Sequence, residues 1–332
     1  MPAHVVFGAG PLGLAVARRL ISAGKPVRLV NRSGKADAPP GVEVVAADVS
    51  DPSSARRASE GAAVIFHCAS GPYGHWSRTL PLIMRGMIEA AVATGARVVY
   101  GDNLYAYGPV DGPITEDLPY RPIGPTTRAR AEVATMLMDA HAAGRVRATI
   151  GRASDFYGPH ARQSNAGDIV FARALEGKPA QALGNPDAPH TYTFIDDFAA
   201  GLITLADRNE ALGQVWHIPS APTITTRQFI ALVFTQLSRP SRLRVAPKLV
   251  IQLMGVMMPP MRAVAETLYQ SERPWVVDHT KFARAFGNEP TPHEDAIAQT
   301  IPWFTSLGGY RALNSTLPAG SSRSSPRRPG QP

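Results

Sequence analysis

The sequence predicts an α/β fold in which a parallel sheet carries helices on both faces. Short apolar runs alternate with amphipathic helical segments through the first half of the chain, as is typical of a doubly wound sheet. A glycine-rich turn joins the first apolar run to the first helical segment, and ligands of such sheets bind at the carboxyl ends of the strands. Hydrophobic residues make up 44% of the 332 residues and charged residues 18%, which is sufficient for a large core.

The first strand, turn and helix carry the strongest local signal. Residues 5–7 form a short apolar strand, residues 12–23 form an amphipathic helix, and the turn between them fits the pattern G-x-G-x-x-G. Such glycines permit a tight turn, close approach of the backbone to a pyrophosphate, and close packing of helix on strand. The alternative is a glycine-rich turn that holds no ligand. We predict a Rossmann-type dinucleotide site that includes Gly8, Gly10, Pro11, Leu12 and Gly13.

The other elements of the first half follow from apolar periodicity and its interruptions. Gly24 ends the first helix, and a Pro-Pro-Gly run at residues 39–41 separates the second strand from the third. Further strands are expected at 27–30, 42–46, 64–67, 97–100 and 148–150. Further helices are expected at 53–59, 82–93 and 128–141.

The second half of the chain lacks the regular alternation of strand and helix patterns. From about Gly158 the segments become irregular and prolines interrupt them, although helices recur at 167–175, 198–206 and 226–237. We therefore predict a smaller, mostly C-terminal substrate lobe. The expected organisation is a dinucleotide-binding domain over 1–157, a mixed region of lobe and returning sheet strands over 158–312, and a disordered tail rich in Ser, Pro, Gly and Arg over 313–332.

Composition excludes several classes of protein. The single Cys68 excludes an internal disulfide and fits a reducing cytosol. The apolar stretch 249–261 is too short to span a bilayer and contains two adjacent prolines. The net charge of +8 does not indicate nucleic-acid binding, because the basic residues are scattered or lie in the tail. The nine histidines show no metal-ligand spacing. We expect a cytoplasmic protein that acts on a small molecule, with no metal, membrane or nucleic-acid partner.

Several separated motifs resemble one known family. Residues 103–109 read Asn-Leu-Tyr-Ala-Tyr-Gly-Pro, residues 114–119 read Ile-Thr-Glu-Asp-Leu-Pro, and residues 152–159 read Arg-Ala-Ser-Asp-Phe-Tyr-Gly-Pro. Together with Thr-Phe-Ile-Asp-Asp at 193–197, they are similar to motifs of the NAD(P)-dependent epimerase/dehydratase group of extended short-chain dehydrogenases. The resemblance covers roughly residues 3 to 305.

The departures from that family concern its catalytic groups. Members carry a serine or threonine together with a Tyr-x-x-x-Lys pair, and the corresponding positions here hold Asn103, Thr126 and Arg130. A threonine hydroxyl is a poor acid or base at neutral pH. An arginine can bind ribose hydroxyls or phosphate but does not titrate. Phe7 also stands where the family's first glycine would fall, so the chain resembles the atypical branch that has lost the Tyr and Lys pair.

Two functional hypotheses follow from this resemblance. In the first, the protein transfers a hydride between nicotinamide and a carbonyl or secondary alcohol of a sugar nucleotide or secondary metabolite. Another group then serves as acid, with Tyr105, Tyr107, Tyr157 and Asp102 near the pocket. For this hypothesis the expected residues of the reacting centre are Asn103, Tyr107, Thr126 and Arg130. In the second, the protein is a catalytically inactive NAD(P)-binding sensor or scaffold.

The end of the second strand bears on the choice of cofactor. An NAD site usually places a carboxylate there, whereas this chain has Asn31 and Arg32. An arginine can pair with the 2′-phosphate of NADP and stack on adenine. We therefore predict NADP, with NAD as the alternative, and include both residues in the cofactor site.

The remaining cofactor contacts are implied by the resemblance. Asp48 and Val49 match the family's adenine-contacting segment, and Ala69 and Ser70 match its small-residue turn beside the phosphate and ribose. Members of the family often pair through two long helices. Here those helices would be 82–93 and 128–141, so we expect a homodimer.

Overall fold

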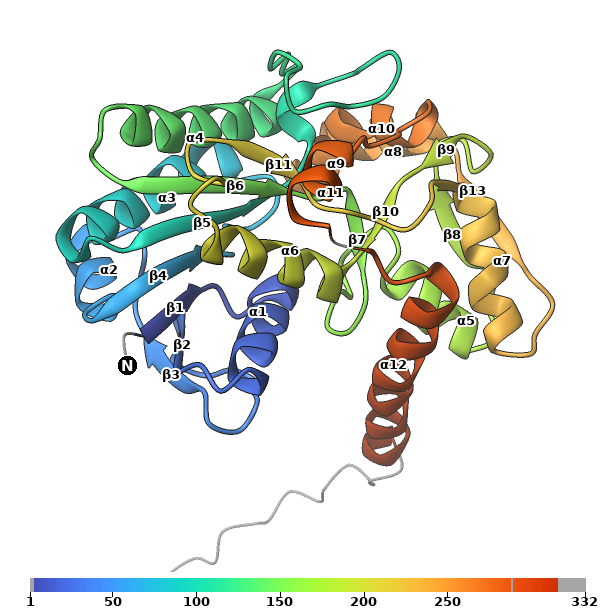
Figure 1. Ribbon diagram of the computed structural model, residues 1–332. Helices are drawn as coiled ribbons and strands as arrows, with labels where there is room; N and C mark the ends of the chain where they lie inside the picture. The colour runs from blue at the N-terminus through green and yellow to red at the C-terminus, as the bar shows by residue number, and fades with distance from the viewer. Residues whose placement is uncertain (1–2, 288, 316–332) are drawn as a thin grey trace, which may run out of the picture.

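The computed structural model describes residues 3–287 and 289–315, and a seven-stranded parallel sheet lies at its centre (Figure 1). The strand order is β11-β6-β5-β4-β1-β2-β3, which is the order of a doubly wound nucleotide-binding sheet extended by one strand. The predicted fold class is confirmed. The strands are β1 (Ala3–Phe7), β2 (Val27–Asn31), β3 (Glu43–Ala46), β4 (Ala62–His67), β5 (Arg97–Asp102), β6 (Arg147–Arg152) and β11 (Val215–His217).

Helices cover both faces of this sheet. On one face α1 (Pro11–Ser22) packs against α6 (Ile195–Asp207). On the other face α3 (Trp76–Thr94) packs between α2 (Pro52–Ala58) and α4 (Pro125–Ala142) (Figure 1). The start predicted for α3 was wrong, because the helix begins six residues before residue 82 and contains Pro81 near its N-terminus. Every helix in the described part of the chain is too short or too polar to cross a membrane.

The second half of the chain forms smaller sheets and further helices beside the large sheet. The paired strands are β7 (Asp155–Tyr157) with β10 (Tyr192–Phe194), β8 (Ala180–Leu183) with β13 (Leu243–Ala246), and β9 (Pro189–His190) with β12 (Ile224–Thr225). The expected helix at 167–175 is a π-helical turn, η2 (Asp168–Ala172), followed by α5 (Arg173–Leu175). The other helices are η1 (Tyr105–Tyr107), α7 (Thr226–Gln236), α8 (Lys248–Met257), α9 (Pro259–Thr267), α10 (Tyr269–Glu272), α11 (Thr280–Phe286) and α12 (His293–Ser315).

The predicted tail differs from the structure where the two overlap. Residues 313–315 belong to α12, which continues to Ser315. The rest of the predicted tail, residues 316–332, lies outside the described residues.

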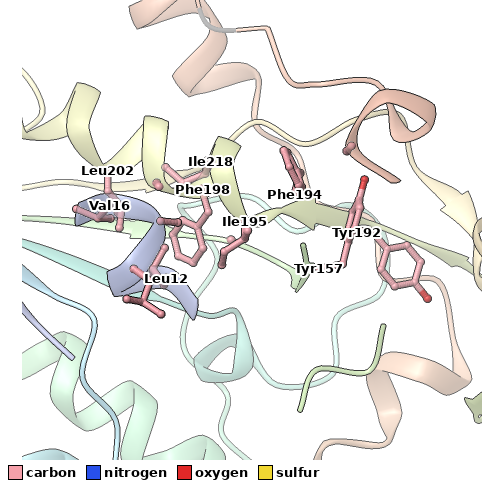
Figure 2. Close-up of a cluster of buried hydrophobic side chains, with 14 of the residues drawn as sticks. Leu12, Val16, Tyr157, Tyr192, Phe194, Ile195, Phe198, Leu202 and Ile218 are labelled. Carbon is pink, nitrogen blue, oxygen red and sulfur yellow. The ribbon is translucent and has the colours of Figure 1, made fainter. Parts of the chain in front are cut away.

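One buried cluster joins the sheet layer to the smaller sheets (Figure 2). Leu12 and Val16 of α1 pack with Phe198 and Leu202 of α6 at one end of this cluster. At the other end it continues through aromatic side chains of β7 and β10, namely Tyr157, Tyr192 and Phe194. This continuous core fixes the position of the smaller sheets relative to the large sheet, and both contribute residues to one cavity.

The turn after β1 depends on two close backbone approaches. Gly8 adopts a φ of +105°, where a Cβ atom would meet the Cys68 carbonyl oxygen at 2.6 Å. A Cβ atom on Gly13 would lie 1.7 Å from the Gly8 carbonyl oxygen, so only glycine lets α1 begin so near the strand. Gly10 is different, since a Cβ atom there would meet nothing within 4 Å.

We predict that Gly13→Ala destabilises the protein while Gly10→Ala does not. The added methyl of Gly13→Ala must displace backbone, which we expect to cost at least about 2 kcal/mol of unfolding free energy. Gly10→Ala is the matched control and should stay within about 0.5 kcal/mol of the parent. Urea unfolding without added nucleotide measures both, and equal stabilities would contradict the close packing.

Candidate active site

A cavity of about 700 Å³ opens at the carboxyl ends of β1, β4, β5 and β6. The large sheet contributes the glycine turn, the residues after β4 and the residues after β5 and β6. The smaller part of the molecule contributes residues 160–165 and the residues of α9 and α10 that face them. The cavity therefore lies where the topology of a doubly wound sheet places a ligand.

The glycine turn supplies the features that a dinucleotide phosphate requires. Gly10, Pro11 and Leu12 line the cavity, and the N-terminus of α1 has neither a side-chain cap nor an acidic residue in its first turn. The open space beside Gly10 admits a ligand atom close to the backbone. Ala69 and Ser70 also line the cavity. Gly8 and Gly13 do not line the cavity, but their close backbone contacts set the shape of the turn.

The predicted adenine end lies outside the cavity. The Asn31 side chain closes its own turn, because its oxygen accepts hydrogen bonds from the backbone N–H groups of Ser33 and Gly34. Arg32 is exposed and close enough to Asp48 to act on its carboxylate. Hydrogen bonds from Ser50 are the main cause of the lowered pKa of Asp48. Asn31 is thus committed to the turn, whereas the Arg32 guanidinium is available.

Asn103 and Arg130 are the predicted reacting-centre residues that line the cavity. The side-chain oxygen of Asn103 accepts a hydrogen bond from the Tyr105 backbone N–H at 3.1 Å. This bond assigns the oxygen, so the amide nitrogen of Asn103 remains as a donor. A donor fixed in this way is suited to hold a carbonyl oxygen.

A buried ion cluster lies beneath these two residues. The Asp102 carboxylate is fully buried and lies 3.0 Å from Arg152 Nε and 3.2 Å from Arg130 Nη1. The Tyr100 hydroxyl donates to the same carboxylate at 3.1 Å. Strand register brings the cluster together, because Asp102 of β5 pairs directly with Arg152 of β6. The sequence prediction did not include Arg152 among the site residues, although this arginine begins the motif at 152–159.

Tyr107 and Thr126 do not line the cavity. His217 Nδ1 donates to the Asp278 carbonyl, so its Nε2 accepts the Tyr107 proton across 2.9 Å. Burial raises the pKa of Tyr107 to about 12. The short η1 turn directs Tyr107 toward β11, while Tyr105 of the same turn lines the cavity. Thr126 lies at the start of α4, where its backbone N–H donates to the Glu266 carboxylate.

Aromatic side chains form one wall of the cavity. Trp76 packs edge-on to Tyr73 and lies 6.2 Å from Tyr105 between ring centroids. Its indole N–H donates to the Gly71 carbonyl, which fixes the ring. Burial raises the pKa of Tyr105 well above its usual value. No group of three or more His, Cys, Asp or Glu side chains that could hold a metal ion lies within the described ranges.

The sequence of the chain matches the model of one known family. The NAD dependent epimerase/dehydratase family matches residues 4–218. The chain belongs to this family. Membership confirms the resemblance drawn from the sequence motifs, and with it the expectation of an NAD-dependent enzyme of the epimerase and dehydratase class.

Individual relatives are distant. A dTDP-glucose 4,6-dehydratase of Streptomyces griseus is 22% identical over 238 residues, which span 71% of this chain and 66% of that relative. A double mutant of dTDP-glucose 4,6-dehydratase from Streptomyces venezuelae, solved with NAD bound, has a TM-score of 0.76 at 20% identity, covering 93% of this chain and 98% of that one. UDP-glucuronic acid 4-epimerase from Bacillus cereus, solved with UDP-glucuronic acid and NAD, has a TM-score of 0.75 at 16% identity, covering 92% and 99%. The two solved structures have the same fold as this chain.

We predict that Asp102→Asn strongly destabilises this family member. The change leaves two buried guanidinium groups without their shared carboxylate, which we expect to cost about 3–5 kcal/mol. Glu89→Gln is the control, since it breaks the exposed pair with Arg145 and should cost less than about 1 kcal/mol. Guanidinium or urea unfolding of the two variants compares them, and similar small losses would show that Asp102 is not a structural centre.

Proposed function

We propose that the protein is an NADP(H)-dependent oxidoreductase that reduces a carbonyl to a secondary alcohol. When bound, the nicotinamide supplies or accepts the hydride. The observation that carries the proposal is the amide nitrogen of Asn103, a fixed donor that lines the same cavity as the glycine turn. Arg130 and Tyr105 line this cavity too. A carbonyl bound there can therefore meet a positive charge on Arg130 and a hydroxyl proton on Tyr105.

The choice of NADP rests on the turn after β2. Among the described residues this turn offers no carboxylate at the strand end, and it presents the exposed Arg32 followed by Ser33. The Asn31 side chain holds this turn closed, which positions Arg32 beyond the sheet edge. A guanidinium binds the dianionic 2′-phosphate of NADP with paired hydrogen bonds, whereas NAD offers only a hydroxyl there.

We predict that Arg32→Ala weakens NADPH binding at least about 10-fold, because it removes a charge-assisted contact worth 1.5–3 kcal/mol, roughly the value of such bonds. NADH binding should stay unchanged. Calorimetric titration measures both affinities, and Arg145→Ala on the far side of the sheet controls for net charge. Equal losses for NADPH and NADH, or no loss for either, would refute the assignment to the 2′-phosphate.

Tyr105 is the proton donor that we propose in place of the family's tyrosine. Its hydroxyl lies 3.4 Å from Gln270 Nε2, and it lines the cavity from the turn that Asn103 begins. Burial raises the pKa of Tyr105, so the hydroxyl stays protonated at neutral pH. An alkoxide is a much stronger base than a phenolate and takes that proton. Because the Tyr105 hydroxyl stays protonated, the enzyme is ready to donate a proton before the carbonyl substrate binds.

We predict that Tyr105→Phe lowers kcat for carbonyl reduction by about 10²-fold or more, because it removes the general acid. NADPH affinity should not change. Tyr107→Phe is the matched control from the same turn, since Tyr107 does not line the cavity and its hydroxyl is bonded to His217 at 2.9 Å, and we expect a smaller loss. Steady-state NADPH oxidation measures both variants. Full activity of Tyr105→Phe would remove this residue from the mechanism.

The substrate class follows in the first place from the relatives. Their names specify sugar nucleotides, so UDP- and dTDP-hexoses belong in the first screen of carbonyl and alcohol substrates. If NADPH binds tightly while no carbonyl or sugar nucleotide is turned over, the alternative of a catalytically inactive binding protein replaces the proposal.

The oligomeric state and the cellular compartment are also part of what we propose. We propose a cytosolic homodimer that pairs through α3 and α4. Leu82 and Val92 of α3 support this face, because each leaves 46% of its surface exposed. Cys68 is the single cysteine of the sequence and forms no internal disulfide, which supports a reducing compartment.

A further inference from the structure

We propose that the cavity binds a carboxylate on Arg130, and that the substrate is a 2-oxo acid which the enzyme reduces to a 2-hydroxy acid. The proposal rests on the proposed function, which it narrows to substrates bearing an anionic group beside the reacting carbonyl. The relatives' substrates do not suggest this class. It follows from the charge and the free hydrogen-bonding edge of one buried arginine.

The buried cluster around Asp102 carries an excess positive charge. Arg130 and Arg152 contribute two positive charges, and Asp102 contributes one negative charge. Tyr100 and Tyr107 do not compensate, because burial raises their pKa values and keeps both hydroxyls neutral. An uncompensated charge in a buried site is costly, and an anionic ligand removes that cost. The cluster therefore favours a ligand with one negative charge beside Arg130. The other carboxylate that lines the cavity, Asp155, lies against His190 and accepts a hydrogen bond from Asn165.

The guanidinium of Arg130 presents a free edge for such a ligand. Its Nη1 donates to the Tyr100 hydroxyl at 2.8 Å and lies 3.2 Å from Asp102. Its Nε is buried without a partner, and Nη2 makes no hydrogen bond to the described residues. Nε and Nη2 form the side-on edge that receives both oxygens of a carboxylate. The Arg130 side chain is 9% exposed and lines the cavity, so the ligand must enter from there. Because Nε is itself fully buried, the ligand meets Nη2 first, and a small shift of the covering side chains brings its second oxygen to Nε.

Trp76 fixes the plane of this edge. The guanidinium carbon of Arg130 lies 4.0 Å from the centre of the indole ring. The ring is itself held by its hydrogen bond to Gly71. Stacking on one face and bonding through Nη1 leave Arg130 little freedom to turn, so its free edge is organised before a ligand binds.

We place the reacting carbonyl of the substrate on Asn103. This residue directly follows Asp102, the residue that anchors Arg130, and both Asn103 and Arg130 line the cavity. A 2-oxo acid carries its carboxylate and carbonyl on neighbouring carbons, so it is the simplest substrate that offers an anion to Arg130 and a carbonyl to Asn103. In the reduction, a hydride from the reduced dinucleotide bonds to the carbonyl carbon. The C=O π electrons move to oxygen, which takes the Tyr105 proton, and Tyr105 regains a proton from water.

The test uses oxamate, a carboxylate beside a carbonyl that cannot be reduced, and its neutral counterpart oxamide. Calorimetry with the NADP-saturated protein measures their binding. We expect oxamate to bind at least about 100-fold more tightly than oxamide, since oxamide lacks the charge that pairs with the guanidinium. Equal binding of the two compounds, or no binding of oxamate, would overturn the proposal.

Variants of Arg130 test the residue itself. Arg130→Met should weaken oxamate at least about 100-fold, and Arg130→Lys, which keeps the charge but loses the paired edge, at least about 10-fold. Arg130→Met leaves Asp102 paired with Arg152, and thermal unfolding checks that the variant is folded. If Arg130→Met fails to fold, Arg130→Lys decides. Undiminished oxamate binding by the folded variants would show that Arg130 has a structural role only.

Competition with NADP and the turnover of different carbonyl compounds distinguish the anion site on Arg130 from a cofactor contact and from the proposed function. If oxamate and NADP compete, Arg130 holds an anionic group of the cofactor, and the substrate assignment fails. If oxamate binds through Arg130 while no 2-oxo acid oxidises NADPH, the anion site stands and hydride transfer is refuted. If NADPH reduces neutral ketones as fast as 2-oxo acids and oxamate does not bind, the proposed function stands and the anion site fails.

Discussion

The Asp102 carboxylate is the interaction on which the reacting end of the cavity depends. It lies at the end of β5, where it contacts one arginine from the adjacent strand and one from α4. Arg152 in turn donates to the Tyr120 hydroxyl and stacks over the Tyr107 ring at 4.7 Å. A single carboxylate thus holds β5, β6 and α4 in one electrostatic unit. Asn103, the next residue, acquires its orientation from this unit.

The two ends of the cavity are built by different physical means. At the cofactor end, the backbone supplies the binding groups, and the essential property of Gly8, Gly10 and Gly13 is the absence of a side chain. At the reacting end, long side chains supply the groups, and burial holds them in place. The residues of the cofactor end are close together in the sequence, and their backbone tolerates little change of shape. The reacting end is assembled from distant segments, which makes it the end where a family can change its chemistry while it keeps its fold.

The difference explains what could be predicted from the sequence. The turn at Gly8 to Gly13 is contiguous, so its strand, turn and helix were identified from the pattern alone, and the parallel sheet followed from the alternation of elements. The partners of Asp102 lie 28 and 50 residues further along the chain, and no local pattern connects them. The sequence prediction chose Tyr107, whereas Tyr105 lines the cavity, because tertiary packing of the three-residue turn decides which of the two side chains faces the cavity.

The carboxylate of Glu266 couples the two parts of the molecule. It belongs to α9, whose Val264 and Thr267 line the cavity, and it accepts hydrogen bonds from the backbone N–H groups of Thr126 and Thr127. The first turn of α4 is therefore completed by a side chain from another segment. Any motion that lifts α9 away from the cavity exposes those amides to water and frays the helix that carries Arg130. Ligand entry and the ordering of that helix are thus thermodynamically linked, and amide hydrogen exchange at the start of α4 reports the state of the cavity.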